Sequence, residues 1–281
     1  MLVVKRVQKL KQLIRKQKAQ NKKIGFVPTM GFLHQGHLSL IKQARLENDF
    51  VVLSIFINPT QFGPKEDFKK YPRNLKGDLS LAKINGVDIF FNPSVNEMYK
   101  NDFQTSVCAG ELASKLCGLS RPEHFDGVCT VVAKLFNITN PDVAYFGQKD
   151  YQQALIIKKM ITDLNFNIKL KVMPIIRETD GLAMSSRNKH LSTTDRQKAL
   201  VISQALKAAS LEFKKGCTET AELKKIIKKL ISGEKYVNID YIEILDAGSL
   251  QRVKYIKKKV VVAVAVKIKT TRLIDNVILK P

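Results

Sequence analysis

The sequence predicts an α/β protein, a Rossmann-like, doubly wound parallel sheet followed by a smaller α+β domain. Over the first two-thirds of the 281 residues, short apolar segments of strand length alternate with segments of helical periodicity. That alternation is typical of parallel sheets with helical crossovers. Beyond about residue 176, helical segments come first and strands follow. We therefore expect a first domain over residues 1–176 and a second over residues 177–281.

The clearest strand of the first domain covers residues 50–57, an apolar run rich in β-branched residues. Such a run is expected for a strand that is buried on both faces. Residues 24–29 form a shorter apolar strand, and residues 38–47 have helical periodicity. Ligands of a doubly wound sheet bind beyond the carboxyl ends of its strands. The remaining elements of this domain are predicted as strands at 87–91, 143–146 and 168–175 and as a helix at 150–164.

The second domain is predicted from a different order of elements. Helical periodicity covers residues 195–214 and 219–231, and Gly216 interrupts it. Strand-like segments follow at 237–245 and 259–267. Helices followed by strands, without strict alternation, are typical of a small α+β domain.

The composition excludes several classes of protein. Hydrophobic residues make up 44% and charged residues 26%, as in a globular rather than a disordered chain. The sequence has no apolar run near the roughly 20 residues of a membrane helix. The N-terminal segment turns basic without the apolar core of a secretory signal, so we expect a cytoplasmic protein without membrane association. The four cysteines have neither CxxC nor metal-ligand spacing, which favours reduced thiols over a zinc site.

The formal net charge of +23 makes a basic RNA-binding module one alternative, since Lys and Arg neutralise phosphates in nucleic-acid complexes. The lysines, however, are spread along the whole chain, and aromatic residues do not interleave with them in a stacking pattern. Basic runs such as residues 5–23 and 224–229 have the spacing of solvated helix faces. We expect no nucleic-acid partner, and a positive field that favours an anionic substrate.

A His-x-Gly-His motif follows the first strong strand of the sheet. Residues 30–37 read Met-Gly-Phe-Leu-His-Gln-Gly-His, and a helical segment begins directly after them. Helix-end amides and the macrodipole favour phosphate, and His34 and His37 can donate hydrogen bonds to the same oxygens. Gly36 leaves room for a nucleotide to approach the backbone. The motif predicts a nucleotide site, because two of the four histidines of the chain fall here.

A second polar segment, Met-Ser-Ser-Arg-Asn at residues 184–188, follows the predicted domain boundary. Two hydroxyls and a guanidinium on a loop can bind a triphosphate and the charge that develops on it. Taken alone, the segment is an ordinary polar loop. Paired with the upstream motif, it resembles the two-signature arrangement of class I nucleotidyltransferases, in which it would stand in for Lys-Met-Ser-Lys-Ser.

Several segments together closely resemble the pantothenate synthetase (pantoate–β-alanine ligase) family, from about residue 24 to residue 276. The family usually has Glu where this chain has Gln35 and Gln148, and neither change removes a group that we assign to chemistry. The segments that carry the resemblance are 27–31, 56–63, 71–73, 121–128, 145–153, 180–188 and 270–276.

The resemblance implies an ATP-dependent ligase. Such an enzyme makes pantoyl adenylate from pantoate and ATP with release of pyrophosphate, and β-alanine then displaces AMP. It further implies Mg²⁺ on the phosphates and a homodimer. The residues that it places in the chemistry are His34, His37, Lys149 and Arg187. The full set that it implies for ATP is Met30, Gly31, Phe32, Leu33, His34, Gln35, Gly36, His37, Gly147, Gln148, Lys149, Asp150, Ile176, Met184, Ser185, Ser186 and Arg187.

For pantoate, the resemblance points to the amides of Gln61 and Gln153, which can both donate and accept hydrogen bonds. Asp78 is a candidate for holding metal-bound water. Arg121 and His124 have either a supporting or a structural role, and the sequence leaves both open. The other residues implied for the substrate pocket are Pro28, Met30, Asn58 and Phe146.

The nearest alternative is another enzyme of the superfamily, an adenylyltransferase whose product keeps the nucleotide. Such an enzyme also binds its nucleotide through a His-x-Gly-His motif. It would lack the segments that contain Gln61 and Gln153, and it would lack the 184–188 loop in this form.

Overall fold

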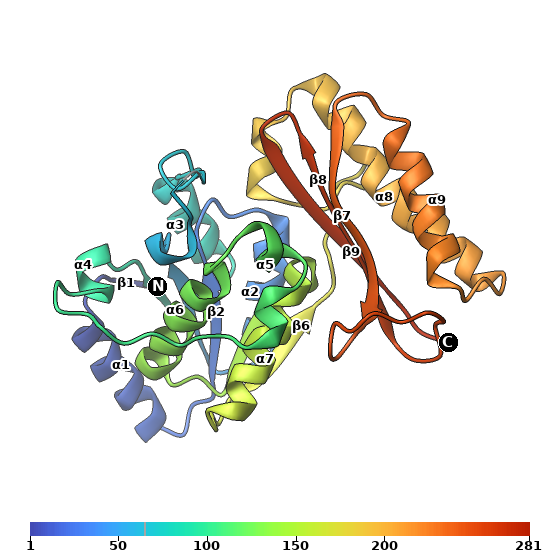
Figure 1. Ribbon diagram of the computed structural model, residues 1–281. Coiled ribbons are helices and arrows are strands. Elements are labelled where there is room, and N and C mark those ends of the chain that lie inside the picture. The colour runs from blue at the N-terminus through green and yellow to red at the C-terminus, as the bar shows by residue number, and fades with distance from the viewer. Residues whose placement is uncertain (65) are drawn as a thin grey trace. The chain divides into compact units, whose positions relative to one another are not determined.

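The computed structural model describes residues 1–64 and 66–281. Its described residues divide into two compact units (Figure 1). The first unit comprises Met1–Gln148 and Gln152–Pro174, and the second comprises Lys149–Tyr151 and Ile175–Pro281. The short segment Lys149–Tyr151 therefore belongs with the C-terminal part of the chain.

Six strands of the first unit form a parallel sheet in the order β1-β4-β3-β2-β5-β6. From β2 the chain proceeds outward through β3 and β4, and it then returns to add β5 on the other side of β2. This reversal is the topological switch point at which doubly wound sheets bind ligands. The strands are β1 Leu2–Val4, β2 Ile24–Thr29, β3 Phe50–Ile55, β4 Ile89–Phe91, β5 Val143–Gly147 and β6 Lys169–Met173.

Helices cover both faces of this sheet. On one face, Val27 and Leu53 pack against Ile41 and Ala44 of α2, and Ala82 of α3 belongs to the same cluster. On the other face, the ring of Phe26 meets the ring of Phe136 in α6 edge-on, with 6.4 Å between centroids. The helices of this unit are α1 Val7–Ala19, α2 Gln35–Glu47, α3 Leu75–Ile84, α4 Val95–Met98, α5 Cys117–Ser120, α6 His124–Thr139 and α7 Tyr151–Asp163 from Gln152 on, with 3-10 turns η1 Pro59–Gln61 and η2 Glu111–Ser114. The 3-10 turn η3 Gln148–Asp150 lies where the chain passes between the two units.

The second unit is an antiparallel sheet in the order β7-β8-β9 with two helices on one side of it (Figure 1). Its core is formed by apolar side chains of β8, such as Val262 and Val264, and of the helices, such as Ile202 and Ile227. The elements are η4 Ser186–His190, α8 Thr193–Lys214, α9 Thr220–Ser232, β7 Val237–Asp246, β8 Val260–Ile268 and β9 Thr271–Leu279.

The predicted fold class is confirmed, although three of the predicted strands were too long. The strand predicted at 87–91 begins only at Ile89. The strand predicted at 50–57 ends at Ile55, because Asn58 and Pro59 begin the 3-10 turn η1. The strand predicted at 168–175 ends at Met173, directly before Pro174, which has no N–H for a ladder hydrogen bond. Both ends lie at the carboxyl edge of the sheet, where the candidate site begins.

Candidate functional site

The His-x-Gly-His motif forms a tight turn between β2 and α2. Gly31 has a φ of 87° and Phe32 a φ of 54°, both in the left-handed region. A Cβ atom on Gly31 would lie 2.9 Å from the side chain of Ile55, so glycine is required here by conformation and by space. This turn delivers His34 to the N-cap position of α2.

The two histidines cap α2 reciprocally with their side chains. The Gly36 amide donates to Nδ1 of His34 at 3.1 Å, and the His34 amide donates to Nδ1 of His37 at 3.4 Å. The two rings lie 4.1 Å apart between centroids. Since Nδ1 of each ring accepts a hydrogen bond, a neutral imidazole at either position carries its proton on Nε2. Both rings are therefore in the tautomer that donates a hydrogen bond from Nε2.

Asp78, in the first turn of α3, binds the backbone of the turn between β2 and α2. Its two carboxylate oxygens accept the Phe32 amide at 2.9 Å and the Leu33 amide at 2.7 Å. The side chain belongs to a residue that is only 3% exposed. Burial raises the pKa of Asp78, although the two amides partly oppose that shift. A metal at Asp78 would have to share these oxygens, and the metal role of this residue stays a prediction.

We expect Asp78→Asn to disturb this turn specifically. One amide N–H would then face an NH₂ group in place of an oxygen, which costs about 1–3 kcal/mol for a buried donor. The free energy of unfolding should fall by this amount, and the rate of nucleotide chemistry should fall with it as the histidine pair loses its support. Denaturant unfolding and single-turnover assays measure the two effects, with exposed Asp102→Asn as the control. Wild-type stability and rate in Asp78→Asn would contradict this role.

Gln61 and Asn58 lie together at the carboxyl end of β3. The Nδ2 group of Asn58 donates to Oε1 of Gln61 at 3.3 Å and to the Gly127 carbonyl at 3.0 Å. The Gln61 amide nitrogen lies 3.2 Å from the sulfur of Met30. A Cβ atom on Gly127 would lie 2.3 Å from the carbonyl oxygen of Thr60, so α6 approaches η1 as closely as glycine allows. The structure thus brings together three residues predicted for the substrate pocket.

Arg121 and His124 support the main chain of Gln61. The carbonyl of Gln61 lies 2.8 Å from Nδ1 of His124 and accepts from Arg121 at 3.3 Å. Arg121 also lies 3.0 Å from Nε2 of His124 and makes a two-pronged ion pair with Glu66. Burial pushes the pKa of Glu66 upward, but the Arg121 hydrogen bonds and charge outweigh burial and leave it below its ordinary value. The two residues whose role the sequence left open hold Gln61 in place.

The carboxyl end of β5 adds the third set of predicted residues in this unit. Phe146 is buried, and a Cβ atom on Gly147 would meet nothing within 4 Å. Gln153 is half-buried in the first turn of α7, whereas neighbouring Gln152 is buried and bonds to backbone groups of Leu112, Lys115 and Cys117. Pro28 is half-buried in β2, which lies beside β5. Predicted substrate residues thus lie in or after the last residues of three adjacent strands of the sheet.

In the second unit, the predicted nucleotide residues lie on a short braced loop. The Met184 amide donates to the Ile176 carbonyl at 3.0 Å, so these two candidate contacts to adenine and ribose are neighbours. Ser185 caps η4 by accepting from the Arg187 amide at 3.3 Å, and Ser186 is buried. His190 lies exposed at the end of η4.

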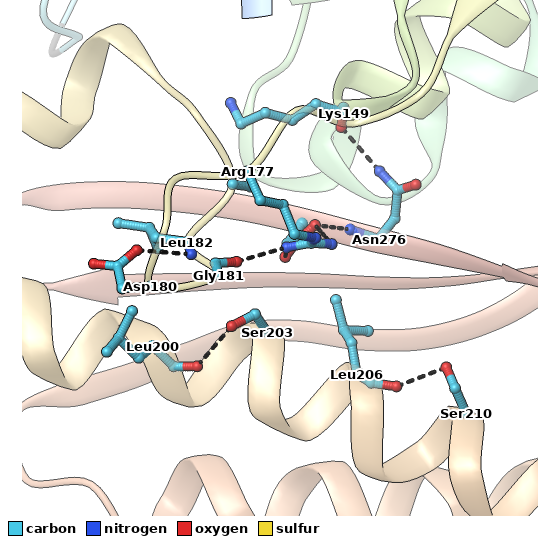
Figure 2. A network of polar contacts seen from close by, with 12 residues as sticks. Lys149, Arg177, Asp180, Gly181, Leu182, Leu200, Ser203, Leu206, Ser210 and Asn276 are labelled. Carbon is cyan, nitrogen blue, oxygen red and sulfur yellow. Dashed lines mark hydrogen bonds and ion pairs between the residues drawn. The ribbon is translucent and has the colours of Figure 1, made fainter. Parts of the chain in front are cut away.

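A charged network fixes the base of this loop. Arg196 donates to Glu178 at 2.7 Å and to Asp180 at 2.6 Å, and Asn188 donates to Glu178 at 2.7 Å. Asp180 also accepts the Leu182 amide at 3.1 Å, within the group of polar contacts in Figure 2. These bonds connect the two ends of the segment from 178 to 188 to each other and to α8.

Sequence reasoning missed two residues that support the site and gave a third a different role. Glu66 and Tyr99 were not singled out, and Asp78 was considered only for metal. Tyr99 donates to Oδ1 of Asn58 at 2.8 Å, and burial raises its pKa. Each lies far in sequence from the group that it holds, so no local spacing marks it. Across residues 1–64 and 66–281, no group of three or more His, Cys, Asp or Glu side chains could hold a metal ion, and no helix could span a membrane.

Comparison with known proteins places the chain in one family. The family model described as pantoate-beta-alanine ligase matches residues 2–278. A pantothenate synthetase of Acetivibrio thermocellus is 52% identical over the full length of both chains, and one of Caldicellulosiruptor saccharolyticus is 50% identical over the same share.

Solved structures agree with that match. The pantothenate synthetase of Thermus thermophilus has a TM-score of 0.95 at 41% identity, and each chain is covered completely. A pantoate-beta-alanine ligase of Francisella tularensis, complexed with β-γ ATP and β-alanine, has a TM-score of 0.82 at 37% identity over 99% of this chain and 97% of the other. The chain belongs to the pantoate–β-alanine ligase family.

Proposed function

We propose that this protein joins pantoate to β-alanine at the expense of ATP, through a pantoyl-adenylate intermediate, and releases AMP and pyrophosphate. The observation that carries the proposal is the histidine pair at the start of α2, in the tautomer that donates from Nε2, together with the Gln61 amide, which lies 3.2 Å from the sulfur of Met30 at the end of β2. Paired Nε2 donors fit phosphate oxygens, and the amide fits a small hydroxy acid. The solved relative complexed with β-γ ATP and β-alanine supports ATP and β-alanine as substrates here.

In the first step, a carboxylate oxygen of pantoate attacks the α-phosphorus of ATP, and the bond to the bridging oxygen of pyrophosphate breaks. The nucleophile is already charged, so the step needs no strong base. It needs in-line placement and neutralisation of the charge on the phosphates. We assign that neutralisation to His34, His37, Lys149 and Arg187, aided by Ser185 and Ser186, and His37 is our candidate to donate to the departing pyrophosphate.

In the second step, the β-alanine amine attacks the acyl carbon of the adenylate. The acyl C–O bond breaks, AMP leaves with the oxygen that came from pantoate, and the amine loses a proton. The acyl carbon must stay in one place through both steps, and we assign this task to Gln61 and Gln153.

Mg²⁺ is part of this proposal as a companion of ATP. The ion binds phosphate oxygens and keeps several waters, and it commonly takes only one or two protein carboxylates. When bound, it neutralises phosphate charge. Among our candidates, Asp78 is the only carboxylate considered for it.

We further propose a cytoplasmic homodimer. The resemblance to a family of biosynthetic enzymes that form homodimers supports both statements. Light scattering of the purified protein should give twice the chain mass of 31.7 kDa. A monomeric mass at micromolar concentration would contradict the dimer.

Gln61 and Gln153 should act on pantoate rather than on ATP. We expect either substitution, Gln61→Ala or Gln153→Ala, to weaken pantoate binding roughly 5- to 150-fold, because a polar group left half-satisfied costs about 1–3 kcal/mol. The KM for ATP should stay nearly unchanged. Steady-state kinetics with each substrate varied in turn measure both, and exposed Gln12→Ala is the matched control. An equal loss for ATP would show that the assignment is wrong.

Product analysis tests the function itself. The protein is incubated with ATP, pantoate and β-alanine, and the mixture is analysed by mass spectrometry. We expect pantothenate, AMP and pyrophosphate, with turnover that requires both pantoate and β-alanine. Recovery of ADP and phosphate would indicate an acyl-phosphate ligase, and a product that retains the nucleotide would indicate an adenylyltransferase.

A further inference from the structure

Two consecutive residues of β9, Asp275 and Asn276, are buried polar side chains outside the residues assigned so far. Asp275 is 4% exposed and Asn276 is 3% exposed. Polar groups this deeply buried are retained only where they are hydrogen-bonded, and each has specific partners. Those partners lie in the two segments of the second unit that carry the proposed phosphate contacts.

Asn276 holds the main chain of Lys149. Its Nδ2 group donates to the Lys149 carbonyl at 3.0 Å. Figure 2 shows this bond at the backbone end of Lys149, while the amine end of the side chain points away from Asn276. The hydroxyl of Tyr151 donates to the Ala247 carbonyl at 2.6 Å, which ties the other end of the same short segment. The backbone from which the Lys149 amine extends is therefore fixed at both ends.

Asp275 holds Arg177, which lies at the base of the loop that leads to Met184. Two guanidinium nitrogens of Arg177 donate to the two carboxylate oxygens of Asp275 at 2.6 and 3.0 Å. The same guanidinium donates to the Gly181 carbonyl at 3.1 Å, and Arg177 pairs with Ala183 across the loop. The backbone N–H of Asn276 donates to a carboxylate oxygen of Asp275 at 2.8 Å, and this bond orients the carboxylate. A bidentate pair of this kind fixes direction as well as distance.

We propose that Asp275 and Asn276 are a positioning pair, which sets Lys149 and the Met184–Arg187 loop in one fixed relation for adenylate formation. The inference rests on the proposed function, because it assumes that Lys149 and this loop contact the phosphates of ATP. The stability of the fold does not require buried polar side chains at these two positions, since apolar side chains of similar volume stabilise a core at least as well as a buried ion pair. Accurate placement of Lys149 and the loop does require specific polar contacts, because an error of about 1 Å in the position of a reacting group can lower the rate about 10²-fold.

The test is a double-mutant cycle between Asn276→Asp and Lys149→Ala. Asn276→Asp keeps the shape of the side chain but replaces the donor with an acceptor that faces the Lys149 carbonyl. We expect the single-turnover rate of pantoyl-adenylate formation to fall about 10-fold or more, with KM for β-alanine nearly unchanged. In the Lys149→Ala background the same substitution should cost less than about 3-fold, because the group being positioned is already absent. Asn238→Asp, at an exposed position of β7, should leave the rate unchanged.

Additive losses in the cycle would overturn the inference, since a merely structural residue lowers both backgrounds equally. Asn276→Ala removes the donor without adding a charge. The same cycle with Lys149→Ala is measured with this variant if Asn276→Asp does not fold. A normal rate for Lys149→Ala would also overturn it, because Lys149 would then not be the group that needs placement. Failure of the proposed function is a separate result, in which the wild-type protein forms no pantoyl adenylate and no pyrophosphate from pantoate and ATP.

Discussion

Lys149→Ala should lower the rate of pantoyl-adenylate formation about 10²-fold or more, the usual loss for one preorganised donor to a developing charge. The side chain is half-buried, and the hydrogen bond from Asn276 of β9 is accepted by the Lys149 carbonyl, which alanine retains. The fold should therefore survive the change. Rapid-quench measurement of pantoyl adenylate, with the wild-type or variant enzyme in excess over ATP, gives the rate of adenylate formation directly.

The matched control for this experiment is Lys158→Ala, which removes an exposed lysine from the same stretch of chain on α7. Its rate should equal that of the wild type, so a general effect of lowering the positive charge is excluded. A near-normal rate in Lys149→Ala would show that this lysine is not a phosphate contact.

His37→Ala should remove most of the activity, and His37→Gln should retain more of it. Glutamine can still donate a hydrogen bond but takes no part in proton transfer. The difference in rate between His37→Gln and the wild type therefore measures the contribution of proton transfer. The loss for alanine should reach about 10²-fold or more, since a donor to the departing pyrophosphate is removed. Single-turnover adenylation of the three proteins measures the series.

Thermal melts distinguish this role from a structural one. His37 accepts the His34 amide at the long distance of 3.4 Å, so its contribution to the cap of α2 is small. We expect the melting temperature to change little in either variant. A large drop in melting temperature with intact chemistry would mean that the imidazole serves the turn and not the substrate.

The fold was predictable where one physical signal dominates a short stretch of chain. The apolar run that became β3 has no exposed face in a parallel sheet, and the sequence shows this directly. The strand β9 was missed, because Arg272, Asp275 and Asn276 interrupt the alternation that marks a strand. Those residues are polar on account of their partners in other segments, and β8 alone reads as a clear apolar strand.

The candidate site was predictable where residue types cluster in sequence, as in the His-x-Gly-His turn. Its support was not predictable in this way. Asp78 meets the turn from a distance of more than forty residues along the chain. Arg121 meets Glu66 and Gln61 from a similar separation. Such contacts depend on which strands are neighbours, and periodicity within one segment carries no information about that order.

The central claim is that pantoate is activated as an adenylate, and an oxygen-transfer measurement tests it most directly. Pantoate labelled with ¹⁸O in both carboxylate oxygens is converted with ATP and β-alanine, and the products are weighed by mass spectrometry. Attack of the carboxylate on the α-phosphorus predicts one ¹⁸O atom in each AMP and one in each pantothenate. Unlabelled AMP, or label recovered in orthophosphate, would contradict the account.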